Sequence, residues 1–120
     1  MPTTDIACSI SPYFEVFEGR LDAFRDLCER FVARTRSEEG CLYYGFCFDG
    51  NQIHCREAYR DARSLLAHLQ NVADLLAESQ RLAKLTRLEI AGPESELQHL
   101  RGPLAAYKPQ FLVLEYGFRN

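Results

Sequence analysis

An almost entirely apolar strand that runs into a tight turn constrains the fold of this chain most. The segment 41–48 contains no charged side chain, and Asp49-Gly50 follows it directly. An Asp-Gly pair between two strand-like runs indicates a β-hairpin, so a return strand is expected over 52–59. A strand with one solvated face alternates apolar and polar side chains. Because 41–48 does not alternate, we predict that both of its faces are covered.

Helical patterns flank this hairpin on both sides. Upstream, 21–36 holds apolar side chains at helical spacing, namely Leu21, Phe24, Cys28, Phe31 and Val32. Gly40 is expected to end this helix in a left-handed conformation. Downstream, Asp61 is a suitable N-cap for a helix that carries His68. Asn71 is expected to divide the second apolar stripe into two helical pieces.

Two further strands complete a β–α–β–β–α–β order. Side chains that favour β structure lie over 6–17, before the first helix, and over 86–91, after the second. This order is that of a ferredoxin-like split βαβ sandwich, an α+β fold with helices on one face of an antiparallel sheet. We therefore predict this fold for a core of about residues 8–91.

An extension over 92–120 follows the predicted core. Gly92-Pro93 ends the preceding strand, a short helix is expected over 94–100, and a strand over 111–116. We expect this strand to join a sheet edge or the sheet of a partner subunit, because an exposed edge is otherwise open to unwanted pairing. Core and extension together are expected to form one domain over 1–120.

Composition excludes several classes of function. The net charge of −3 lacks the basic surplus that nucleic-acid binding usually requires. No apolar run approaches the roughly 18 residues of a membrane span, and no secretory signal pattern is recognised. The five cysteines include no C-x-x-C pair, so we expect reduced thiols and a cytoplasmic location.

Three motifs in this order resemble the antibiotic biosynthesis monooxygenase (ABM) family of the dimeric α/β-barrel superfamily. Glu38-Glu39-Gly40-Cys41-Leu42-Tyr43-Tyr44 resembles the family's E-x-G-C-x-x-Y passage from helix to strand. Glu57-Ala58-Tyr59-Arg60-Asp61 resembles its E-x-Y-x-D passage from strand to helix. Leu66-Ala67-His68-Leu69 resembles the family's histidine-bearing helix. The resemblance covers roughly residues 8–90.

This resemblance implies a homodimer in which two sheets pack face to face, with a pocket between sheet and helices in each subunit. Family members include oxygenases of quinols and anthrones that use neither metal nor flavin, and others degrade haem or act as isomerases. The haem-degrading members usually carry a second histidine shortly after the first. The matching segment here, Gln70-Asn71-Val72-Ala73, holds no histidine, so the resemblance does not extend to haem degradation. The chain also lacks the tryptophan that is common in several active members of the family.

His68 is the leading catalytic candidate, because a histidine that faces an apolar pocket can take a proton from a phenol. Glu57 and Tyr59 share one face of the return strand and are the other catalytic candidates. The substrate-binding candidates are aromatic, namely Tyr44, Phe24 and Phe46. Each also has a purely structural interpretation: a hydrogen-bonded helix histidine, a carboxylate paired with a nearby arginine, and core aromatics.

The opposite face of the return strand carries His54 and Arg56, for which an interface role is expected. His99 is expected to be solvated, and the three histidines form no metal motif, so neither metal nor cofactor is expected. The sequence thus favours a cofactor-independent monooxygenase acting on a quinol-like or polycyclic phenol. Two alternatives remain open: a non-catalytic dimeric domain that binds a small aromatic ligand, and an isomerase with His68 as proton shuttle.

Overall fold

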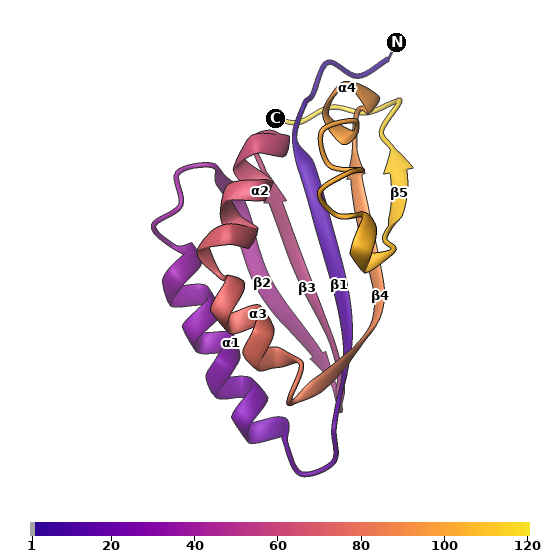
Figure 1. The fold of residues 1–120 in the computed structure, drawn as a ribbon. Helices are drawn as coiled ribbons and strands as arrows, with labels where there is room; N and C mark the ends of the chain where they lie inside the picture. Colours follow the sequence, from indigo (N-terminus) through magenta and orange to yellow (C-terminus); the bar gives the residue numbers. More distant parts are fainter. Residues whose placement is uncertain (1) are drawn as a thin grey trace.

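Strands and helices follow one another in the predicted order (Figure 1). The structure is a computed structural model that describes residues 2–120. Its elements are β1 (Cys8–Val16), α1 (Leu21–Thr35), β2 (Cys41–Asp49), β3 (Gln52–Tyr59), α2 (Ala62–Asn71), α3 (Ala73–Ser79), β4 (Ala83–Gly92), α4 (Glu94–Leu97), the 3-10 turn η1 (Ala105–Tyr107) and β5 (Gln110–Val113).

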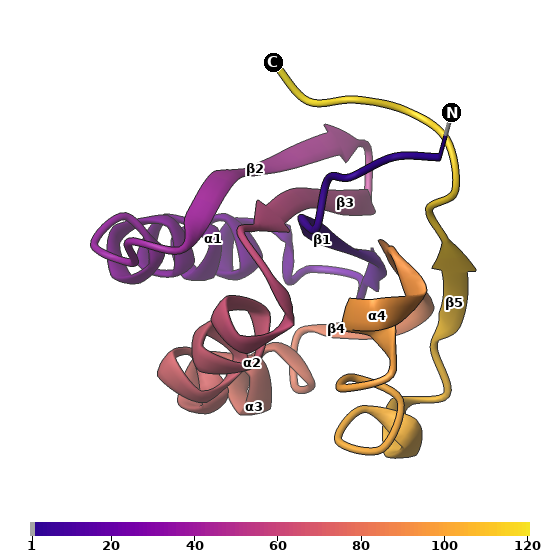
Figure 2. The ribbon, with the colours of Figure 1, turned by 90° about the horizontal axis from the view of Figure 1, so that it is seen from above.

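The five strands form one sheet in the order β2-β3-β1-β4-β5. The first four pair antiparallel, as a ferredoxin-like sandwich requires, and β5 adds to β4 in parallel. Helices α1, α2, α3 and α4 all lie on the same face of the sheet (Figures 1 and 2). The predicted α+β fold is confirmed, and no helix within residues 2–120 lies over the other sheet face.

Local sequence signals account for the turns and helix boundaries. Gly50 has a φ of +60°, the left-handed conformation that a tight hairpin turn requires. The Asp61 carboxylate accepts a hydrogen bond from the Ser64 amide at 2.8 Å and so begins α2. The break expected at Asn71 is present, since α2 ends there and α3 begins at Ala73.

Three local predictions were wrong. Gly40 does not have a positive φ; its Cα instead lies against the Ser64 side chain, where a β-carbon would clash. The helix expected over 94–100 ends at Leu97, and the chain continues as hydrogen-bonded turns through Leu100 to Leu104. The last strand is Gln110–Val113 and is shorter than expected, since β4 offers pairing partners only as far as Gly92.

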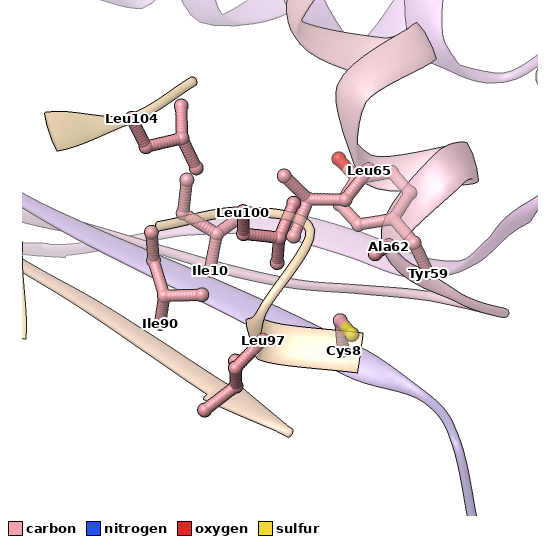
Figure 3. Close-up of a cluster of buried hydrophobic side chains, with 9 residues drawn as sticks. All are labelled: Cys8, Ile10, Tyr59, Ala62, Leu65, Ile90, Leu97, Leu100 and Leu104. Carbon is pink, nitrogen blue, oxygen red and sulfur yellow. The ribbon is translucent and has the colours of Figure 1, made fainter. Parts of the chain in front are cut away.

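The extension is packed into the core. Its buried leucines, Leu97, Leu100 and Leu104, contact Ile10 and Ile90 of the central strands (Figure 3). Leu65 of α2 belongs to the same cluster, so the extension and α2 lie side by side on one sheet face. The chain ends also meet, because the Thr3 amide donates to the Glu115 carbonyl at 2.8 Å. The extension therefore covers the half of the sheet that α1 to α3 leave open.

Candidate active site

A cavity of about 290 Å³ lies between the sheet and helices α2 and α3. All four core strands contribute to its wall, and most of the lining side chains are aliphatic or aromatic. Only two lining residues, Glu57 and His68, carry an acid or an imidazole. Such a space, mostly apolar with a few polar groups on one side, is the usual form of a small-molecule site.

The register of the sheet places the polar side chains of the cavity wall next to each other. Glu57 of β3 lies opposite Tyr44 of β2 on one side and Ile10 of β1 on the other. All three side chains point to the helix face because inward positions alternate along each strand. Ile10 lies next to Ile90 in turn, so this row changes from polar to apolar as it crosses the sheet.

Glu57 is buried, with 5% of its surface exposed. The Tyr59 hydroxyl donates to Glu57 Oε1 at 2.6 Å, and Tyr59 itself is fully buried. Burial raises the pKa of Glu57 to about 7, although the Tyr59 and Cys55 hydrogen bonds pull it down. A carboxyl group with such a pKa exchanges its proton near neutral pH, as general acid–base chemistry requires.

His68 lies between two carboxyl groups. Its Nδ1 is 2.9 Å from Glu38 Oε2 and 3.0 Å from Glu38 Oε1, and its Nε2 is 3.4 Å from Glu57 Oε1. Because a carboxylate only accepts, the Nδ1 atom carries the hydrogen in this contact. The Nε2 lone pair of a neutral His68 then faces Glu57 and the cavity. This tautomer is the one in which a histidine can take a proton from a ligand.

Three further side chains fix this arrangement. The Asn71 side-chain amide donates to Glu38 Oε2 at 2.8 Å, which holds the carboxylate against the imidazole. The rings of Tyr44 and Tyr59 pack on the His68 ring at centroid distances of 5.3 and 4.9 Å. Burial lowers the pKa of His68, while its hydrogen bond to Glu38 opposes that shift. The neutral imidazole is therefore the stable form at neutral pH.

The thiol in this region is not an activated nucleophile. Cys55 is buried next to Glu57, and burial with the nearby carboxylate raises its pKa far above the ordinary range for a thiol. A nucleophilic cysteine needs the opposite shift. Among residues 2–120, no group of three or more His, Cys, Asp or Glu side chains is arranged to hold a metal ion.

The cavity brings together most of the residues selected from the sequence. Its lining includes five of the six, namely Phe24, Tyr44, Phe46, Glu57 and His68. Tyr59 does not line the cavity and reaches it only through its hydrogen bond to Glu57. Sequence reasoning missed Glu38, which was interpreted only as part of a helix end. Its position as the first residue of the E-x-G-C-x-x-Y motif was the available signal.

The outer sheet face carries the residues expected at an interface. The His54 ring stacks on Tyr13 at 4.5 Å between centroids, and the Arg56 guanidinium lies 4.4 Å from the centre of the Tyr43 ring. Tyr43 is 43% exposed. No helix in the described part of the chain is long and apolar enough to cross a membrane.

Comparison with solved structures shows that nearly the whole length of the chain is similar to a known structure. MupZ from Pseudomonas fluorescens is 51% identical, covers 96% of this chain and 95% of its own, and superposes with a TM-score of 0.92. A conserved protein from Methanosarcina mazei Go1 is 22% identical with a TM-score of 0.67, covering 72% of this chain and 91% of its own.

A protein from Mycobacterium tuberculosis is 23% identical with a TM-score of 0.65 and covers 72% of this chain and 94% of its own. These two more distant likenesses show the fold alone. No curated protein matches the chain. The family model for antibiotic biosynthesis monooxygenase matches residues 10–78, which span β1 through most of α3 and include both carboxyl groups and the imidazole of the site. The chain therefore belongs to the antibiotic biosynthesis monooxygenase family.

Proposed function

We propose that this protein is a cofactor-independent enzyme that moves a proton on a small phenolic molecule, and that the reaction is a monooxygenation. The observation that carries the proposal is the His68–Glu57 pair, which lies 3.4 Å apart in the wall of an otherwise apolar cavity. Family membership supplies the oxygenase class. A quinol-like or polycyclic phenol fits the aromatic side chains at this end of the cavity.

In the proposed reaction, His68 Nε2 or ionised Glu57 takes a proton from the substrate. The resulting electron-rich anion transfers one electron to O₂, and the radical pair combines to form a carbon–oxygen bond. The peroxide formed in this way takes up a proton and loses water, which leaves a carbonyl group on the substrate. The protein supplies the base, the returning proton, a dry pocket and a fixed geometry.

Glu38 and Tyr59 act through their neighbours in this scheme. Glu38 holds the Nδ1 hydrogen of His68 and so keeps Nε2 free to accept. Tyr59 donates to Glu57 Oε1 and favours its ionised form against the effect of burial. Both are positioning residues, since neither lines the cavity.

An isomerisation is the second candidate, favoured by the presence of an acid and a base in direct contact. Glu57 holds a proton near neutral pH and His68 Nε2 is free to accept one. Such a pair can remove a proton from one position of a substrate and return it at another, with no net oxidation. This reaction needs no O₂, which separates it from the first candidate.

Oxygen uptake with a panel of quinols and anthrones tests the proposal. We expect uptake with the native protein and a loss of at least about 100-fold in His68→Ala, the usual contribution of a positioned base. His99→Ala is the matched control because His99 is an exposed histidine outside the cavity. Unchanged turnover in His68→Ala contradicts the proposed role. Turnover that persists without O₂ favours the isomerase, and binding without turnover favours a ligand-binding domain.

We further propose that two copies of the chain pair through the outer sheet face. Proteins of this family are generally dimeric. The outer face supports this pairing, because Tyr43 is exposed there and no helix in the described part of the chain covers it. The proposed dimer covers the second face of β2, as its apolar sequence led us to expect.

A further inference from the structure

The cavity has a wall that the family's common domain does not provide. Leu104 and Tyr107 line it, and both belong to the segment after β4. The family model matches residues 10–78 and so ends before this segment. Leu104 is buried against Ile10, and Tyr107 is 55% exposed at the edge of the cavity. Figure 3 shows Leu104 above the central strands, with its side chain directed toward Ile10.

The polar and apolar parts of the cavity are separated across the sheet. Glu57 is on β3, and His68 faces it from α2. Two strand positions further along the sheet order, Leu85 and Leu88 of β4 line the cavity, and Leu104 with Tyr107 continue the wall beyond them. Two strand spacings amount to roughly 10 Å, and Leu104 with Tyr107 lie beyond that distance, so a hydroxyl-bearing ring at Glu57 leaves room for an apolar tail of several carbons.

The cavity wall contains no counter-ion for an anionic ligand. No lysine or arginine lines it, and its single acidic side chain, Glu57, repels negative charge. A negatively charged tail in this cavity meets no oppositely charged side chain and is disfavoured by the cost of burying an unpaired charge. The chemistry of the wall thus selects a neutral molecule with one polar end.

From this geometry we infer that the substrate is a neutral, elongated molecule whose hydroxyl-bearing end meets His68 and Glu57 and whose apolar tail extends to Leu104 and Tyr107. The extension thereby sets which tail length is bound. The inference concerns the same cavity as the proposed function and rests on it for the identity of the polar end. The tail preference is measured by binding, so it stands or falls separately from turnover.

A series of 4-alkylphenols, from methyl to octyl, measures this preference by calorimetric titration. In the native protein we expect affinity to increase with chain length up to about seven carbons and then to level off. In Tyr107→Ala, the Kd of 4-heptylphenol should rise about 4- to 15-fold, the effect of losing contact with one or two methylene groups. The Kd of 4-methylphenol, whose substituent ends before this wall, should change by less than about twofold.

Two variants make the test specific. Tyr107→Phe keeps the ring and should retain the native dependence on chain length. Tyr116→Ala removes another exposed tyrosine of the extension, one that does not line the cavity, and should leave the whole series unchanged. The inference is overturned by an equal effect of Tyr107→Ala on short and long probes, by the same effect in Tyr116→Ala, or by absence of binding. Both proposals are confirmed if His68→Ala loses turnover while its affinity for the alkylphenols still depends on chain length as in the native protein.

Discussion

The Nδ1 atom of His68 lies 2.9 Å from the Glu38 carboxylate, between residues that are 30 positions apart in the chain. Glu38 comes from the turn after α1, and His68 comes from the last turn of α2. Only 3% of the His68 side chain and 14% of the Glu38 side chain are exposed. The contact therefore sets the tautomer of the imidazole in a region from which water is largely excluded.

Replacing Glu38 with glutamine should lower kcat by about 10- to 100-fold while changing KM little. The amide keeps the size of the side chain but can present its NH₂ group to Nδ1, which favours the opposite tautomer and blocks Nε2. Steady-state kinetics with the substrate identified in the oxygen-uptake panel measure the effect, and nitrogen NMR of His68 reports the tautomer directly.

Glu39→Gln is the matched control, because Glu39 is the exposed neighbour of Glu38 in the same turn. It should leave both kcat and the His68 tautomer unchanged. A Glu38→Gln protein with native kcat and an unchanged nitrogen spectrum shows that the contact has no role in positioning His68.

Glu57→Gln should change how stability depends on pH. Burial raises the pKa of Glu57 from 4.5 to about 7, so the folded state binds more protons than the unfolded state between these values. The native protein therefore loses free energy of unfolding as the pH rises from about 4.5 to about 7. Glutamine removes this loss, which is on the order of 3 kcal/mol for a shift of this size.

Urea unfolding at pH 4.5 and pH 8 measures the change. The quantity to compare is the difference between variant and native protein, since the lowered pKa of His68 acts in the opposite direction in both. The free energy of unfolding of the variant minus that of the native protein should be larger at pH 8 than at pH 4.5. Glu15→Gln, an exposed position on β1, should show no such gain. An equal gain in both variants would contradict a special environment for Glu57.

Much of the fold could be predicted from local patterns. The apolar run that ends at Asp49-Gly50 defined the hairpin, and Asp61 defined the start of α2, because turns and caps depend on a few neighbouring residues. Gly40 was misinterpreted for the opposite reason. Its requirement for glycine comes from Ser64, a contact between distant segments that no local rule contains.

The site was only partly predictable. Strand alternation placed Glu57 and Tyr59 on the helix face, and the resemblance of Leu66-Ala67-His68-Leu69 to the family's histidine-bearing helix indicated His68. The Glu38 contact depends on how the turn after α1 packs against α2. The cavity wall at Tyr107 depends on how the segment after β4 folds back over the sheet. Both are tertiary features of segments without regular periodicity, so their sequences alone did not indicate these contacts.

Gly40→Ala should destabilise the fold by about 1–3 kcal/mol, the usual cost of overpacking a tight contact. A β-carbon at Gly40 would clash with the Ser64 side chain in the first turn of α2, and the Arg60 amide bonds the Gly40 carbonyl at 2.8 Å, so neither segment can move freely. Thermal unfolding measures the loss. Gly102→Ala is the control because a β-carbon at this exposed position meets no atom within 4 Å.

The double variant Gly40→Ala, Ser64→Gly removes the clashing side chain and should recover part of the lost stability. The cost of a glycine within a helix, about 1 kcal/mol, limits the recovery. If the double variant is no more stable than the sum of the two single changes predicts, the clash with Ser64 is not the cause.

Tyr43→Arg should weaken the proposed dimer. Tyr43 is exposed on the outer sheet face, and its ring already lies under the Arg56 guanidinium, so a second cation there meets like charge and would be buried by the partner sheet. We expect the dimer dissociation constant to rise by at least about tenfold, measured by sedimentation. Ala33→Arg adds the same charge at an exposed position of α1, on the opposite side of the sheet, and should leave the dimer intact. If Tyr43→Arg sediments as the native protein does, or if Ala33→Arg dissociates equally, the two copies do not pair through this face.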